Sequence, residues 1–232
     1  MPPYITVGFL NIVANAVDNN KGSFTQDDLE GLLAFVYDSE RLASMVLNRY
    51  PQTPFINSFE KTILEAVHAH FYGLHHVAIG GLIPVIEGSG KQIAKARGLD
   101  ETKPVKEVFK DLANFTKSDV INRKIGATNE IVEMIESFLG FIEDYFFVKS
   151  QSYPLLDRTN RHGIAHGAFS DADYGRPLNF YKTIAAVDFL TFISSLGTNY
   201  ISGFVPDPTN ESKGLSLRLK KAQAFGVTNF KT

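Results

Sequence analysis

Apolar residues recur at intervals of three and four along most of this chain, the spacing that places them on one face of an α-helix. The first strong example follows Thr25, whose side chain can form a capping pair with Asp28. The pattern continues to Tyr50, where Pro51 and Pro54 end it. We therefore expect one helix from the capping pair to Tyr50.

The next stretch is apolar on one face from Ser58 onward and contains helix-breaking residues in its middle. Glycine and proline disfavour a helix interior, so Gly80-Gly81 and then Pro84 predict a break or a kink. A separate helix is expected from Pro84 to Ala96.

Three further helices are expected downstream. Pro104 suits the first turn of one, and Asn129 can cap another. The last runs roughly from Pro177 to Leu196 and is apolar on nearly every side. Such a helix must be central in the fold or lie at an oligomer interface.

The alternation typical of strands is confined to Tyr4–Leu10, which fits either a strand or a helix. We therefore predict an all-α helical bundle, with an N-terminal helical region at 1–57, the main bundle at 58–203 and a C-terminal tail at 204–232. The tail begins with a linker rich in proline and polar residues and continues with the basic stretch Leu215–Lys221. It is expected to be mobile or to dock on a partner.

Composition limits the class of protein. The chain has 232 residues, of which 44% are hydrophobic and 21% charged, as in an ordinary globular domain. It has no cysteine, which excludes disulfides, thiolate metal sites and a cysteine nucleophile. The N-terminus lacks the features of a secretory signal, and no apolar run reaches the length of about 20 residues that spans a bilayer. We expect a cytoplasmic protein with no membrane partner.

Charge is distributed unevenly although the net charge is only −2. Residues 91–124 carry nine basic and five acidic side chains, and residues 207–232 carry five and two. The band at 91–124 can attract a polyanion, but such runs are more often solvated helix faces. We favour the solvated face.

The densest candidate chemistry is the segment Arg158-Thr-Asn-Arg-His-Gly-Ile-Ala-His-Gly167, in a chain with only six histidines. Asp157 or Thr159 can cap a short helix there, which would place free backbone N–H groups beside Arg158, Asn160 and Arg161. That arrangement suits phosphate binding. The alternative is structural: Arg161 pairs with a neighbouring acid and the histidines satisfy buried carbonyls.

A metal site is a second interpretation of the same segment. His162 and His166 are four residues apart and would share one helix face. Zinc would need a third ligand, for which Glu87, Asp171 or Asp173 can serve. We prefer a site without metal or other cofactor and keep a zinc-assisted hydrolase as an alternative.

The order of these residues resembles the HEPN superfamily of RNA-cleaving and nucleotide-binding helical domains. Arg161 and His166 match the pattern R-x-x-x-x-H, and the surroundings match a bacterial HEPN-like group with an N-R-H-x-x-x-H-G motif: Asn160–Gly167, Asp173-Tyr-Gly175, Asn179 and the upstream Leu82–Gly88. The similarity covers about residues 58–196. In place of the small polar residue that many members have after the arginine, this chain has His162.

The resemblance implies metal-independent RNA cleavage in which the ribose 2′-hydroxyl attacks the adjacent phosphate. His166 would be the general acid or base, and Arg161 would stabilise charge on the phosphate. Arg158, Asn160, His162, Glu87 and Tyr174 would support these two or bind phosphate. It also implies a homodimer acting on RNA or a nucleotide, in a toxin or phage-defence system with an antitoxin protein as a further partner.

Helix geometry gives a second reason to expect a dimer. Residues five apart on an ideal helix point about 140° away from each other, so Arg161 and His166 of one chain should not meet at one phosphate. Two chains across a two-fold axis would supply them jointly. The alternative to an endoribonuclease is a non-catalytic helical dimer that binds a nucleotide, RNA or a protein partner.

Overall fold

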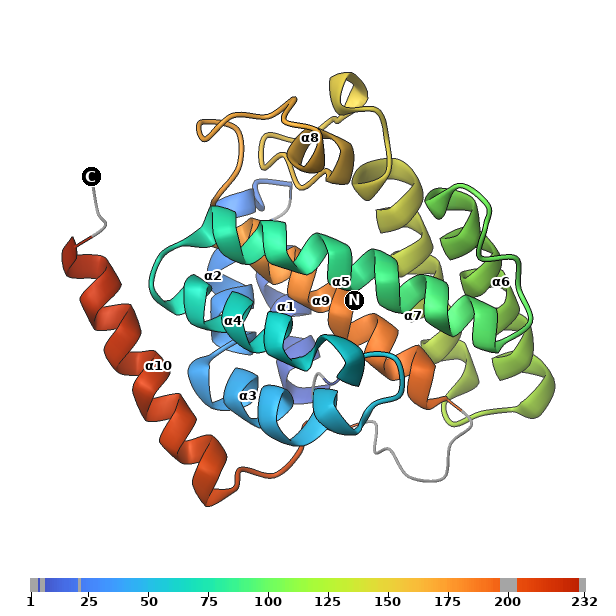
Figure 1. Ribbon diagram of the computed structural model, residues 1–232, viewed down its shortest axis with the longest axis horizontal. Helices are drawn as coiled ribbons and strands as arrows, with labels where there is room; N and C mark the ends of the chain where they lie inside the picture. Colours follow the sequence, from blue (N-terminus) through green and yellow to red (C-terminus); the bar gives the residue numbers. More distant parts are fainter. Residues whose placement is uncertain (1–3, 5–6, 21, 197–203, 230–232) are drawn as a thin grey trace.

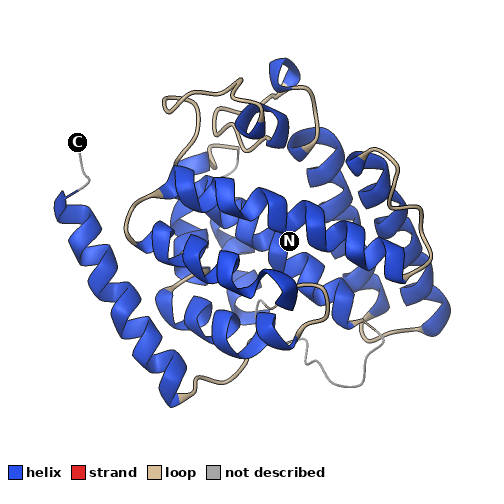
Figure 2. Cartoon of the chain, in the orientation of Figure 1, coloured by secondary structure: helices blue, strands red, loops and turns tan. Residues whose placement is uncertain are grey.

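The computed structural model describes residues 4, 7–20, 22–196 and 204–229, and these residues form helices and loops with no strand (Figures 1 and 2). The α-helices are α1 (Val7–Asn20), α2 (Gln26–Val36), α3 (Ser39–Ser44), α4 (Glu60–Phe71), α5 (His75–Ala96), α6 (Val105–Arg123), α7 (Thr128–Phe141), α8 (Arg161–Ala165), α9 (Pro177–Ser195) and α10 (Asn210–Asn229). Five shorter helical segments lie between them: the π-helices η1 (Met45–Arg49) and η4 (Ile142–Phe146), and the 3₁₀ segments η2 (Tyr50–Gln52), η3 (Asn57–Phe59) and η5 (Ser150–Ser152). The prediction of an all-α fold is confirmed.

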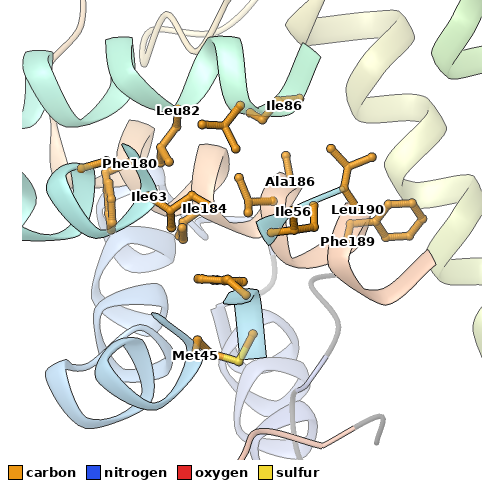
Figure 3. Packing of buried hydrophobic residues seen from close by; sticks show 14 of the residues in the cluster. Met45, Ile56, Ile63, Leu82, Ile86, Phe180, Ile184, Ala186, Phe189 and Leu190 are labelled. Atoms are coloured by element: carbon orange, nitrogen blue, oxygen red, sulfur yellow. The ribbon is translucent and has the colours of Figure 1, made fainter. Parts of the chain in front are cut away.

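Helix α9 lies at the centre of the bundle and packs most extensively against α5. Figure 3 shows Leu82 and Ile86 of α5 facing Ile184 and Leu190 of α9, and all four side chains are fully buried. Each such side chain contributes about 1.5–3 kcal/mol when it leaves water. Of the two interpretations of this apolar helix, the central position is therefore sufficient to explain its composition.

The segment between Thr25 and Tyr50 is not one helix, as the pattern predicted, but a series of helices. Its start is as predicted, because Thr25 and Asp28 cap each other reciprocally. A break follows at Tyr37, and the carboxylate of Asp38 accepts hydrogen bonds from the backbone N–H groups of Glu40 and Arg41. This second cap starts α3, so the apolar periodicity continues while the helix axis does not.

Of the break or kink predicted at Gly80-Gly81 and Pro84, the break is wrong, and so is the separate helix from Pro84, since α5 passes through all three positions. The chain turns earlier, at Gly73, whose φ of 81° is the left-handed conformation that ends a helix. A proline inside a helix costs about 3 kcal/mol. The burial of α5 around Pro84, at residues such as Leu82 and Ile86, offsets that cost.

Other boundaries shift by one or two residues. Helix α6 begins just after Pro104, and α7 begins at Thr128, before the expected cap Asn129. Helix α9 starts at Pro177 as predicted. Of the ambiguous segment Tyr4–Leu10, the part from Val7 onward is helical, and residues 5 and 6 lie outside the described residues.

The C-terminal tail contains a 20-residue helix, α10, that docks on the rest of the chain (Figure 1). It packs against α3 and α4 through the buried side chains of Leu215, Leu219 and Ala222. Ser212 and Thr209 hydrogen-bond reciprocally at its start. None of the described helices is both long and apolar enough to cross a membrane.

Candidate functional site

The segment predicted to carry the chemistry folds around Asn160, which is fully buried. Its side-chain oxygen accepts a hydrogen bond from the backbone N–H of Gly163 at 2.7 Å and so caps α8. Its amide nitrogen donates to the backbone carbonyls of Tyr145 and Val148, at 2.9 and 3.0 Å. Asn160 therefore ties the start of α8 to the end of η4 and positions the residues that follow.

The predicted caps, Asp157 and Thr159, do not cap α8. Asp157 is fully buried and accepts hydrogen bonds from Lys182 Nζ at 2.8 Å, from the hydroxyl of Tyr153 at 3.0 Å and from that of Thr159. Burial alone would raise the pKa of Asp157, but Lys182 and the two hydroxyls outweigh it and lower that pKa. These contacts draw both residues inward, which leaves the cap position to Asn160.

Helix α8 is one turn long and lies beside α5 at one edge of the molecule (Figure 1). Its first residue, Arg161, forms a two-point ion pair with Glu87 of α5: Nε donates to one carboxylate oxygen and Nη2 to the other, the latter at 3.4 Å. Both side chains are about one-fifth exposed, at 21% and 19%. The planar guanidinium is thereby fixed in orientation.

Arg161 and His166 meet within one chain, which corrects the expectation from ideal helix geometry. Nη1 of Arg161 lies 2.8 Å from Nε2 of His166 and 3.3 Å from Nδ1 of His162. The 140° separation does not apply because α8 ends at Ala165, and His166 has φ −103° and ψ 8°. Helix geometry therefore gives no reason to expect a dimer.

The protonation states of the two imidazoles follow from the donor in contact with them. A guanidinium only donates, so Nε2 of His166 and Nδ1 of His162 must be unprotonated acceptors. Burial, followed by the charge of Arg161 and the proximity of His166, lowers the pKa of His162. The rings lie nearly parallel, at 18° and 5.8 Å between centroids, and His166 is exposed.

Two other predicted site residues contact different partners. Arg158, at a left-handed φ of 57°, lies over the ring of Phe169 at 5.3 Å. Tyr174 packs edge-on against His76, near the start of α5. Because His76 is eleven residues before Glu87 on that helix, the two positions are about 16 Å apart along the axis. The structure thus brings together Arg161, His162, His166 and Glu87 but does not add Tyr174.

The zinc alternative conflicts with the positive charge at this place. The guanidinium of Arg161 lies against both ring nitrogens that would face a metal shared by His162 and His166. Glu87 is paired with Arg161, and Asp173 accepts hydrogen bonds from Ser170. Among the described residues, no three His, Asp or Glu side chains form a group that could hold a metal ion.

Lys182 lies between two adjoining hollows. One, of about 280 Å³, is apolar and runs between α2, α7 and α9, and the other, of about 310 Å³, adjoins it near Tyr153. Lys182 lines both. Lys182 and its contact with Asp157 were missed from the sequence, although a lysine on an almost wholly apolar helix was a visible signal that it has a buried acidic partner.

No protein-family model, characterised protein or solved structure matches this chain.

Proposed function

We propose that this protein is a metal-independent endoribonuclease of HEPN type. The observation that carries the proposal is the 2.8 Å contact between Nη1 of Arg161 and the unprotonated Nε2 of His166, on an exposed part of the surface. A cation for the phosphate and a base for the 2′-hydroxyl are thus adjacent in one chain.

The reaction assigns one step to each group. The RNA phosphate is a stronger acceptor for guanidinium N–H groups than a neutral imidazole, so its arrival draws Nη1 of Arg161 away from His166. The freed Nε2 accepts the proton of the 2′-hydroxyl as its oxygen attacks phosphorus. The bond from phosphorus to the 5′-oxygen breaks, that oxygen takes a proton from solvent, and the products are a 2′,3′-cyclic phosphate and a 5′-hydroxyl end.

The test is cleavage of labelled RNA in the presence of a chelator by wild type, His166→Ala and Arg161→Ala. We expect the wild type to generate cyclic-phosphate ends and each variant to lose about 10²–10⁴ in rate. His68→Ala is the matched control, a partly buried histidine on α4 outside the cluster. Equal cleavage by wild type and both variants, or none by any, would rule out the enzyme.

The cellular role in the proposal is that of a toxin or phage-defence nuclease acting on cytoplasmic RNA, with an antitoxin as partner. The same variants supply the readout: induced wild type should arrest bacterial growth, and His166→Ala should not. A homodimer remains part of the proposal by resemblance, although the site geometry does not require one.

The second candidate is a non-catalytic protein that binds RNA or a nucleotide through the same cluster. The observation in its favour is that Arg161 is fixed by Glu87 in a position suited to holding a phosphate. It predicts RNA binding that Arg161→Ala weakens, without any cleavage by the wild type.

A further inference from the structure

Helix α10 has two distinct faces. Successive residues of a helix are separated by about 100°, so Leu215, Leu219 and Ala222 share one side, and all three are buried against the bundle. The opposite side carries Lys213, Leu217, Lys220 and Lys221, and the exposed side chains of Arg218 and Phe225 lie at the border between this side and the bundle. We call these six residues the outer face of α10.

The cations of the outer face differ from those of the basic band at 91–124. In that band most cations have an acidic partner, as a solvated helix face would: Lys95 with Glu101, Lys103 with Asp111, Lys110 with Glu143, Lys117 with Glu136 and Arg123 with Asp119. Lys213, Arg218, Lys220 and Lys221 are exposed, and none forms an ion pair within the described part of the chain. Four positive charges are therefore available to an external anion.

The charge environment of Arg218 illustrates the point. On the neighbouring helix α4, Arg218 acts on a histidine, His68. Burial of His68 and then the positive charge of Arg218 lower the pKa of that histidine. Helix α10 itself contains one acidic residue, Glu211, in its first turn. A face of this kind gains from a polyanion, because binding releases the counterions that both surfaces hold.

Apolar side chains are interleaved with these cations. Leu217 is 61% exposed and Phe225 is 52% exposed, and the ring of Tyr72 lies edge-on to that of Phe225 at 6.2 Å. A basic helix face with exposed rings is the combination that single-stranded nucleic acid uses, with phosphates on the cations and bases on the rings.

We propose that the outer face of α10 binds single-stranded RNA, remote from the Arg161–His166 cluster. The choice of RNA as the ligand rests on the proposed ribonuclease function. In this role α10 holds a substrate strand by its phosphates while a distant phosphodiester reacts, which lowers the KM without changing the chemical step.

The experiment measures binding on the His166→Ala protein, so that RNA is not cut. The test variant replaces Lys213, Arg218, Lys220 and Lys221 with Gln. The matched control replaces four paired cations, Lys103, Lys110, Lys117 and Arg123, with Gln and changes the net charge by the same amount. Fluorescence anisotropy with a short labelled single-stranded RNA is read over a series of KCl concentrations, and circular dichroism verifies that both variants fold.

We expect the α10 variant to bind RNA about 10- to 100-fold more weakly and the control to stay within about threefold of its parent. The slope of log affinity against log salt should become shallower by up to about 3, since each phosphate contact on a single strand contributes about 0.7. Equal losses in both variants, or none in the α10 variant, would overturn the inference. Binding of anionic phospholipid vesicles in place of RNA would also overturn it.

The result separates this inference from the proposed function. If the wild type cuts RNA but the α10 variant binds like the control, the inference is wrong and the ribonuclease proposal stands. If the α10 variant loses RNA binding but the wild type cuts nothing, the inference about α10 stands and the ribonuclease proposal is wrong.

Discussion

At the scale of single residues, the position of the Arg161 guanidinium depends on Glu87. Glu87→Gln keeps an acceptor for Nε but removes the charge that fixes Nη2. We expect kcat for RNA cleavage to fall about 10- to 100-fold through misplacement of Arg161, while RNA affinity is unchanged or higher because a negative charge has been removed. Steady-state kinetics separate the two effects, and Glu65→Gln, on the exposed side of α4, is the control.

The alternative is that Glu87 has only a structural role. In that case Glu87→Gln would lower thermal stability and leave kcat of the folded fraction intact. The pair is about one-fifth exposed, so its loss should cost between the 0.2–1 kcal/mol typical of surface pairs and the 3–5 kcal/mol of buried ones. A normal kcat with a lowered unfolding midpoint would contradict a positioning role.

At this scale the types of residue in the cluster were visible in the sequence, whereas their arrangement in space was not. Arg161 and His166 were singled out together from the sequence, but an ideal-helix angle placed them apart, because the short length of α8 was not predictable. Glu87 is 74 residues away from Arg161 in the chain, so no local pattern pairs them. Glu87 entered the sequence analysis as a possible zinc ligand and through the resemblance, but not as the ion-pair partner of Arg161.

At the scale of elements, the single turn of α8 depends on the cap and the three-way contact of Asn160. Asn160→Ala removes a cap, which costs about 0.5–2 kcal/mol, and leaves the partly buried carbonyls of Tyr145 and Val148 without this donor, at roughly 1–3 kcal/mol. We expect a loss of about 2–4 kcal/mol in the free energy of unfolding, measured by urea denaturation. Asn114→Ala, at an exposed position within α6, should be neutral or slightly stabilising. A loss below 1 kcal/mol for Asn160→Ala would contradict the capping role.

Caps were predictable where partners are local and not where they are remote. Thr25 and Asp28 are three residues apart and form the expected box. Asp157 looked equally suitable in sequence, but Lys182 and Tyr153 hold it in the interior. Likewise, a proline such as Pro84 tends to break an isolated helix, yet α5 continues through it because the helix around it is buried.

At the scale of the whole molecule, the all-α bundle was predicted from the helical spacing of apolar residues and the scarcity of strand patterns. The central position of α9 was one of the two locations expected of a helix that is apolar on nearly every side. The docking of α10 was missed, although Leu215, Leu219 and Ala222 carry the spacing of a buried face. The segment before α10 has the composition of a linker, and the whole tail was therefore predicted to be mobile or to dock on a partner. The pairing of the helices themselves depends on long-range packing that no single segment encodes.

The stability of the whole molecule also depends on pH, and two neighbouring histidines of the bundle, His70 and His75, contribute to this dependence. His70 is buried, stacks on Phe180 and lies 3.2 Å from His75, Nδ1 to Nδ1. Burial lowers the pKa of His70 and, with the charge of His76, lowers that of His75 to about 4. In the unfolded chain both should titrate near 6.5, so between pH 6.5 and 4 the unfolded state binds more protons.

The free energy of unfolding should therefore be greatest above pH 6.5 and fall as the pH drops toward 4. The fall is up to about 2.7 kcal/mol per pH unit where both histidines are protonated in the unfolded state and neutral in the folded state. Asp157, whose pKa is lowered, loses its contribution only below its unfolded value near 3.9. Burial raises the pKa of Asp188, so that carboxyl binds its proton more readily in the folded state and offsets part of the loss. Urea unfolding at pH 7.5 and pH 5 should show the loss in the wild type and a smaller loss in His70→Phe, which keeps an aromatic ring against Phe180. An identical pH dependence in the two proteins would mean that His70 is not one of the groups responsible.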